Sequence, residues 1–239
     1  MNKQIDTEEK KYEQFRRLGQ KLHIPTPEHS IELEVRDKNG NIIQRHKQRS
    51  HSWVRNAYNM LLSQMASKAL DDAGVFGAGL LNIKATNGII YDLTHGAAIV
   101  SSPTNMEDSG RGYRAPGADN TYGIQVGSGV NAESFEDFVL QTLIAEGVGA
   151  GQLNYILSEV PAKGYNAGTR VWTITLARYM NNNSGGDVDV NEVGLTTKGV
   201  AGGGERLWIM SRDHLASTVT VPDTGQLKVT YSIQLTYPA

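Results

Sequence analysis

The feature that most constrains the fold of this chain is a succession of short segments, from residue 80 onward, in which apolar and polar residues alternate. Trp172, Ile174 and Leu176 show the pattern, and the segment 226–237 repeats it. Successive side chains of a β-strand point to opposite faces, so this period of two predicts strands with one buried face. Further segments of this kind are LLNIKAT, IIYDLT, YGIQVGSG, QLNYILSEV, VDVNEVGLTT, ERLWIMSRDHL and STVTVP. The series predicts a mainly β protein built as an antiparallel β-sandwich, either jelly-roll or immunoglobulin-like.

A hairpin and a helix are predicted before this series. The run IELEVRDKNGNIIQRHKQ alternates around Asn39-Gly40, which predicts a β-hairpin with a two-residue type I′ turn. Residues 52–69 carry apolar residues in pairs every four positions, which predicts one long amphipathic helix. Its predicted buried stripe contains Trp53, Val54, Ala57, Tyr58, Leu61, Leu62, Met65, Ala66 and Ala69, with Arg55, Asn59, Ser63 and Lys68 outside it.

Residues 1–29 are predicted to form an N-terminal helical arm, outside a β-sandwich domain of residues 30–239. Tyr12, Phe15 and Leu18 recur at three-residue steps in an otherwise polar run, and prolines at 25 and 27 end the helix. This stripe is too narrow to hold the helix by itself, because helical stability in proteins comes mostly from packing a broad apolar face. We therefore expect the three residues to dock in an assembly interface.

Charge is distributed unevenly along the chain. The net charge is -2, but residues 1–70 hold 13 Lys and Arg against 8 Asp and Glu. Arg45, Lys47 and Arg49 belong to this basic part. The simpler interpretation is a solvated hairpin face, and the alternative is contact with an acidic protein surface or nucleic acid. Because aromatic residues do not alternate with these basic ones, specific nucleic-acid binding is not expected.

The stretch NAESFEDFVLQTLIAEGVGAGQL, residues 131–153, combines carboxylates with a glycine-rich turn. A phosphate-binding loop would open a helix and supply a lysine, whereas GVGAG leads into a strand without one. We predict a short helix over 134–146, capped by Asn131 or Ser134, with the charges of Glu133, Glu136 and Asp137 at its first turn, where they cap the helix and are solvated. The predicted covering residues of this helix are Phe135, Phe138, Val139, Leu143 and Ile144.

The titratable residues contain no recognisable catalytic or metal-binding motif. The six histidines include no HExxH pair, and His46 and His51 lie in a basic segment that disfavours a cation. No GxSxG elbow is present, and Arg212-Asp213-His214 lies near the end of a predicted strand. Cysteine is absent, and no apolar run is long enough to cross a membrane. These features predict a non-enzymatic protein with no catalytic residue, cofactor, metal or small-molecule substrate, and without membrane association.

Residues 101–120, SSPTNMEDSGRGYRAPGADN, have no periodicity and predict a long surface loop. Long loops in compact domains are usually functional or form interfaces. Arg111, Tyr113 and Arg114 are therefore candidates for contact with a receptor or a carbohydrate.

Three segments of the chain resemble a family of virion structural proteins from tailed bacteriophages. They are YGIQVGSGVNAESFEDFVLQTLIAEGVGAGQLNY, VWTITLARYMNNNSGGDVDVNEVGLTT and LWIMSRDHLASTVTVPDTGQLKVTYSIQLTYP, and they cover about residues 122–238. The family carries the corresponding motifs in the same order. A helix that follows a basic hairpin, as over residues 52–69, is similar to openings of the same kind of protein.

The resemblance implies a non-enzymatic part of the virion, made in the bacterial host cytoplasm and assembled in several copies at the neck, tail or collar. Its implied partners are copies of itself and the portal or connector, tail or capsid proteins. In such an assembly we expect Arg45, Lys47 and Arg49 to meet the acidic part of a neighbouring copy. The alternatives are a capsid decoration protein and a receptor- or carbohydrate-binding module of the virion.

Overall fold

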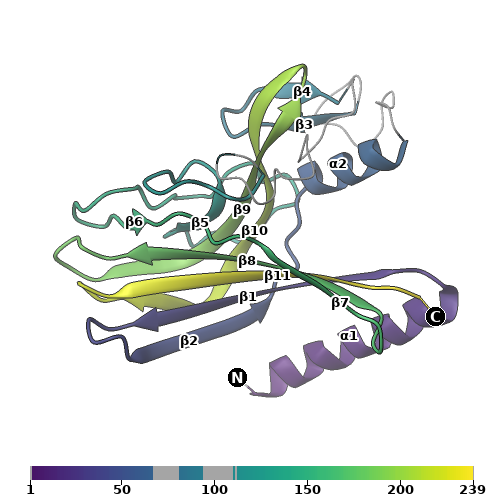
Figure 1. The fold of residues 1–239 in the computed structure, drawn as a ribbon, viewed down its shortest axis with the longest axis horizontal. Helices are drawn as coiled ribbons and strands as arrows, with labels where there is room; N and C mark the ends of the chain where they lie inside the picture. Colours follow the sequence, from purple (N-terminus) through teal and green to yellow (C-terminus); the bar gives the residue numbers. More distant parts are fainter. Residues whose placement is uncertain (1, 67–80, 94–109, 111, 239) are drawn as a thin grey trace.

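The computed structural model describes residues 2–66, 81–93, 110 and 112–238 (Figure 1). Over these residues the chain is mainly β, with two helices, α1 (Asn2–Leu22) and α2 (Arg55–Ala66), and antiparallel sheets. The strands are β1 (Thr26–Arg36), β2 (Ile42–Arg49), β3 (Asn82–Lys84), β4 (Ile90–Asp92), β5 (Gly123–Gly127), β6 (Asn154–Tyr155), β7 (Ala162–Asn166), β8 (Val171–Asn181), β9 (Val188–Ala201), β10 (Gly204–Val221) and β11 (Gln226–Thr236). Neither helix is long and apolar enough to cross a membrane.

Two sheets contribute side chains to one apolar core. The larger has the order β2-β1-β11-β8-β6, with β7 also paired to β8, and the smaller has the order β10-β9-β5. In β11 the alternate residues Leu227, Val229 and Tyr231 are buried, as the period of two predicts. The same core holds Ile31, Leu33 and Val35 of β1, Leu176 and Met180 of β8, and Val188, Val190, Val193 and Leu195 of β9. The predicted mainly β, antiparallel class is therefore confirmed.

The hairpin predicted at Asn39-Gly40 is present, but its turn differs from the prediction. Only Gly40 of the pair has positive φ, at 82°. Its amide donates to the carbonyl of Asp37 over 2.9 Å, and the Asp37 side chain accepts the amides of Asn39 and Asn41. These bonds define a type I turn followed by a left-handed glycine, in place of a type I′ turn. Gly88 has the same φ between β3 and β4.

Helix α1 confirms the predicted N-terminal helix, but the sheet begins earlier than predicted. Strand β1 starts at Thr26, which pairs with Thr236 of β11, so residues 26–29 belong to the sheet. Pro25 and Pro27 do not prevent this pairing. Figure 1 shows α1 outside the sheets, on the side of β1.

Helix α2 confirms the predicted helix as far as Ala66, and residues 67–69 lie outside the described part of the chain. Its orientation differs from the prediction. Tyr58, Leu61 and Leu62 are exposed, Leu61 at 59%, whereas Asn59 and Ser63 are buried. The apolar stripe expected to face the core therefore lies partly on the surface.

Asparagine side chains set this orientation of α2. The amide group of Asn56 donates to the carbonyl oxygens of Lys84 (2.9 Å) and Ile209 (3.2 Å), and its oxygen accepts the Lys84 amide. Asn59 donates to the carbonyl of Asn82 over 2.8 Å. Buried backbone groups that lack partners are costly. The helix therefore turns its asparagines toward β3 and β10.

The predicted helix over 134–146 is absent, and this segment is an irregular loop. Its backbone amides bond to side chains instead of to a helical ladder: Ser134 donates to Asp137 (2.8 Å), and Gln141 and Thr142 donate to Glu192 (3.0 and 2.8 Å). Side chains that satisfy backbone amides compete with helix formation. Glu192, about 50 residues away in the sequence, therefore accepts backbone amides that would otherwise form helical hydrogen bonds.

The apolar residues of this loop are divided between core and surface. Ile144 is buried as predicted, but Phe135, Val139 and Leu143 are exposed, so their predicted covering role is wrong. Phe138 is half-buried, and the ammonium group of Lys84 lies 3.8 Å from its ring centre.

Candidate functional site

The junction between α1 and β2 is built from ion pairs centred on Arg49. Its guanidinium pairs with Glu9 of α1 (2.7 Å) and with the buried Glu28 of β1 (2.9 Å), and lies 4.4 Å from the ring centre of Tyr12. Arg16 of α1 adds a second contact to Glu28 at 2.6 Å. The pairing with Arg49 lowers the pKa of Glu9 and raises that of Arg49. Tyr12 and Arg49, both predicted as assembly residues, thus join the arm to its own chain.

Three apolar residues in the second half of α1 lie on its surface. Phe15 and Leu18 are exposed, Leu18 at 52%, and so are Leu22 and Ile24 beyond them. Exposed contiguous apolar residues mark interaction surfaces more often than isolated ones do. The arm therefore presents Phe15, Leu18 and Leu22 at steps of three and four residues, which place them on one helix face.

Strand β2 is an edge of the larger sheet, because it pairs with β1 alone among the described strands. Arg45 pairs with Glu34 of β1 at 2.9 Å, and Lys47 is exposed. Ile42 and Ile43 are exposed at the start of the strand. An edge strand offers unpaired backbone groups to another chain. The basic residues predicted for assembly therefore lie on an edge strand, although Gln44 and Gln48 of this strand bond to the backbone of β10.

The residues proposed for receptor contact make internal contacts where the structure describes them. Tyr113 packs against two hydrophobic clusters, and burial raises its pKa well above the ordinary value. Arg114 donates to the carbonyl of Ser158 over 3.3 Å. Arg111 lies outside the described residues, as does most of the predicted loop over 101–120.

Three segments singled out in the sequence meet at the buried carboxylate of Glu192. Oε1 accepts the amides of Gly129 (3.2 Å) and Thr142 (2.8 Å), and Oε2 accepts that of Gln141 (3.0 Å). A Cβ at Gly129 would lie 2.6 Å from this carboxylate, so only glycine fits there. The VGSG and NEVGL motifs are therefore in direct contact, because Glu192 of NEVGL accepts the amide of Gly129 in VGSG.

Arg212 completes this arrangement from β10. Its Nε donates to Glu192 over 2.7 Å, one Nη donates to Asp137 over 2.9 Å and to the carbonyl of Ala132, and the other Nη donates to the carbonyl of Asn131. The prediction that Asp137 only caps and solvates is wrong, because it is one acceptor of a buried guanidinium. Desolvation opposes the charge of Arg212, but the carboxylates outweigh it and raise its pKa. We call Asp137, Glu192 and Arg212 the motif cluster.

Next to the motif cluster, Asp213 is fully buried with an asymmetric set of contacts. Its Oδ2 accepts the hydroxyls of Ser50 (2.8 Å) and Ser211 (3.0 Å), and the Tyr231 hydroxyl contacts both serines. Its Oδ1 has no hydrogen-bond partner among the described residues. Burial raises the pKa of Asp213 to about 6.

Two further side chains approach Asp213 from other segments. His51 and Glu133 each offer a ligand-type atom, and these atoms and one of Asp213 lie within 4.8 Å of one another. Glu133 also accepts the amide of His214 over 2.9 Å. The cluster borders a surface pocket of about 550 Å³, lined by His51, Ser52, Trp53, Tyr58, Glu133, Ser134 and Phe135.

Sequence reasoning missed this cluster because its members lie about 80 residues apart with no local spacing that signals a ligand set. The basic surroundings that argued against a cation at His51 are also neutralised in the fold. Arg49 pairs with Glu9 and Glu28, and Arg55 pairs with Glu136.

No protein-family model, curated protein or solved structure matches the chain.

Proposed function

We propose that the chain is a structural subunit of a tailed-bacteriophage virion that assembles in several copies at the neck, tail or collar. The sequence resemblance over residues 122–238 supports this proposal, and the quoted motifs contain all three residues of the motif cluster: Asp137, Glu192 and Arg212. In this proposal those motifs are architectural. They fix the irregular loop over 128–146 to the sheets, and no catalytic activity is assigned to them.

We further propose that the two sheets form a β-sandwich of the jelly-roll or immunoglobulin-like kind. The shared core supports this proposal, because it takes side chains from β1, β8 and β11 of one sheet and from β5, β9 and β10 of the other. Packing of two sheets across one apolar layer is the defining property of a sandwich. Such a slab leaves its rim and outer faces for contacts between copies.

The observation that carries assembly is the exposed apolar stripe Phe15, Leu18 and Leu22 on α1. The helix is fastened by ion pairs at one side, through Arg49 and Arg16, and presents this stripe on the surface. A patch on each copy that fits a different patch on the next copy generates a ring when the rotation closes. The partners in this proposal are other copies and the portal or connector, tail or capsid proteins of the particle.

Self-association can be tested by light scattering on the purified full chain over a range of concentrations. We expect a defined oligomer for the wild-type chain, and weaker association for a Leu18→Ser and Leu22→Ser double variant. Val130→Ser is the control, because Val130 is an apolar residue that is more exposed than Leu18 and Leu22 but lies in the loop after β5. Thermal unfolding should be nearly unchanged in all variants. A wild-type chain that stays single at every concentration, or a control that loses association equally, contradicts the proposal.

Receptor or carbohydrate binding is a second candidate function, favoured by a surface cluster of three aromatic residues. Tyr165 of β7 lies 5.6 Å from Trp172 and 5.9 Å from Tyr237, measured between ring centres, and all three rings are exposed. Aromatic rings combine a large apolar area with a polar edge and favour interfaces. Glycan-array retention that Trp172→Ala abolishes would favour this candidate, whereas retention by no glycan would leave assembly as the function.

A further inference from the structure

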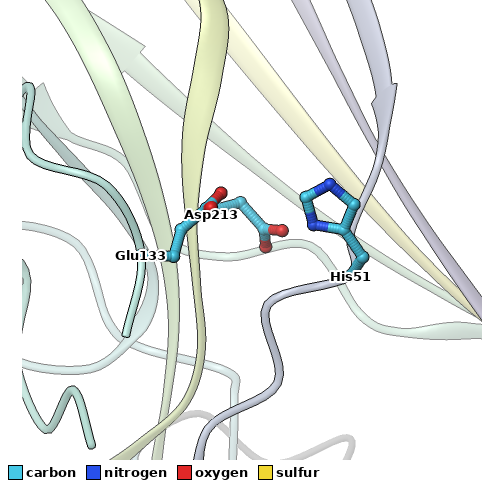
Figure 2. Close-up of side chains that lie close together, drawn as sticks. All are labelled: His51, Glu133 and Asp213. Atoms are coloured by element: carbon cyan, nitrogen blue, oxygen red, sulfur yellow. The ribbon is translucent and has the colours of Figure 1, made fainter. Parts of the chain in front are cut away.

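We propose that His51, Glu133 and Asp213 bind one divalent transition-metal ion of the Zn²⁺ class. The three side chains come from the segment after β2, from the loop between β5 and β6, and from β10, and Figure 2 shows them converging. Their ligand-type atoms lie within 4.8 Å of one another. In a tetrahedral Zn²⁺ site, ligand atoms about 2.1 Å from the ion are about 3.4 Å apart. His51 is exposed and Glu133 is half-buried, so both side chains have room to rotate toward this spacing.

Each of the three side chains is held by a neighbour through one polar atom, which leaves its second atom for an ion. Nδ1 of His51 contacts the hydroxyl of Ser52 at 3.1 Å, which leaves Nε2. Oε1 of Glu133 accepts the amide of His214, which leaves Oε2. Outer hydrogen bonds of this kind orient the ligands of metal sites. The arrangement is therefore a supported site, unlike a cluster of loose surface charges.

Asp213 provides the independent observation that points to a ligand. The side chain is fully buried, its Oδ2 is occupied by Ser50 and Ser211, and its Oδ1 has no hydrogen-bond partner among the described residues. A buried carboxylate oxygen without a partner carries a desolvation cost that a bound cation removes. Figure 2 shows the Asp213 carboxylate directed toward the His51 ring, with the Glu133 carboxylate beside the start of the Asp213 side chain.

The donor set selects the class of ion. One imidazole nitrogen and two carboxylate oxygens match Zn²⁺ and similar first-row ions, whereas Ca²⁺ and Mg²⁺ prefer oxygen ligands only. The fourth position would face the neighbouring pocket over Ser52 and Phe135, which leaves room for water. The ion would join three segments that are distant in the sequence, and it would hold the irregular loop against β10.

The test is Zn²⁺ binding to the chelator-treated full chain, followed by competition with a chromophoric chelator. We expect one site per chain, and His51→Gln and Glu133→Gln should each weaken it at least about 10-fold. Both residues are accessible, so these variants should fold, which near-ultraviolet circular dichroism checks. With Zn²⁺ about 100-fold above its Kd, the midpoint of thermal unfolding should rise by about 5 to 10 °C in the wild-type chain and by much less in the His51→Gln and Glu133→Gln variants.

Two control variants test whether Zn²⁺ binds to other side chains of the protein. His46→Gln alters a histidine of β2 that contacts Ser217 and Gln48, and Glu136→Gln alters a carboxylate of the same loop that pairs with Arg55. Both should bind Zn²⁺ as the wild-type chain does. Absence of binding, equal binding by either ligand variant, or an equal thermal shift with Ca²⁺ would each overturn the assignment. Because the site lies within one chain, these results do not depend on whether the chain assembles.

Discussion

Arg212 and Glu192 form an ion pair in the interior of the protein, with Nε of Arg212 2.7 Å from Oε2 of Glu192 and 3% and 0% of the two side chains exposed. The pair also binds the backbone of the loop between β5 and β6, at its start and near its middle. Glu192 accepts the amides of Gly129, Gln141 and Thr142, and Arg212 donates to the carbonyl groups of Asn131 and Ala132. Burial of two charged side chains is favourable only when their other donors and acceptors also form hydrogen bonds. The backbone of the loop forms those hydrogen bonds with Glu192 and Arg212.

Glu192→Gln should therefore destabilise the protein by about 3 to 5 kcal/mol, because it leaves the Arg212 guanidinium buried with half of its charge compensation. The measurement is urea-induced unfolding. Glu136→Gln is the matched control, since Glu136 pairs with Arg55 but is 52% exposed, and it should change the free energy of unfolding by less than about 1 kcal/mol. Equal losses in the two variants would show that the motif cluster has no special role.

The orientation of α2 leads to a second prediction. Asn56→Ala should cost about 2 to 3 kcal/mol, because it removes two donated hydrogen bonds and leaves the part-buried Lys84 amide without its acceptor. Leu61→Ala removes a larger apolar side chain, yet should change the free energy of unfolding by less than about 1 kcal/mol, because Leu61 is exposed. Thermal unfolding of both variants measures the difference. The reverse order would support the apolar face predicted from the sequence.

The comparison of sequence and structure separates local signals from long-range ones. Period-two patterning predicted β8, β9 and β11 as strands, and in β11 it also predicted the buried face. In β9, residues 192–197 are buried on both faces, which the pattern did not indicate. It predicted the helix of Arg55–Ala66 but not its buried face, because the partners of Asn56 are backbone groups of β3 and β10. No local pattern encodes such partners.

The loop over 131–153 shows the same limit more strongly. Its amphipathic run favours a helix locally, but Glu192 accepts its amides from a strand about 50 residues away. The clustering of His51, Glu133 and Asp213 likewise depends on the packing of three distant segments. Asp137, Glu192 and Arg212 lie in the motifs quoted for the resemblance, but the sequence did not predict their contacts, and Asp137 bonds to Arg212 and does not cap a helix.

His29 leads to a prediction on pH. Its ring lies 4.3 Å from that of Trp53, and burial lowers its pKa from 6.5 to about 4. Between these values the unfolded chain binds a proton that the folded chain does not, so this contribution to stability decreases as pH falls from 6.5 to 4. The loss attributable to His29 should reach about 2 kcal/mol.

The measurement compares urea unfolding of the wild-type chain and of His29→Gln at pH 7 and pH 4.5. Other groups titrate in both chains, so the difference between the two slopes isolates His29. The variant should lose less stability on acidification than the wild-type chain. Identical slopes would mean that His29 accepts its proton freely in the folded state.

The last prediction concerns how α1 is fastened. Arg49→Met removes the pairs to Glu9 and Glu28 and the contact with the Tyr12 ring, while Arg16 still reaches Glu28. Loss of about 1.4 kcal/mol of local stability would raise the population of detached helix about 10-fold. Tryptic cleavage within α1, up to Lys21, should accelerate by the same factor when reattachment is faster than cleavage. Arg45→Met is the control. Arg45 is a basic residue of the same strand, but it pairs with Glu34 of β1 and not with a residue of α1. Cleavage at the wild-type rate in the Arg49 variant would mean that the ion pairs do not hold the arm.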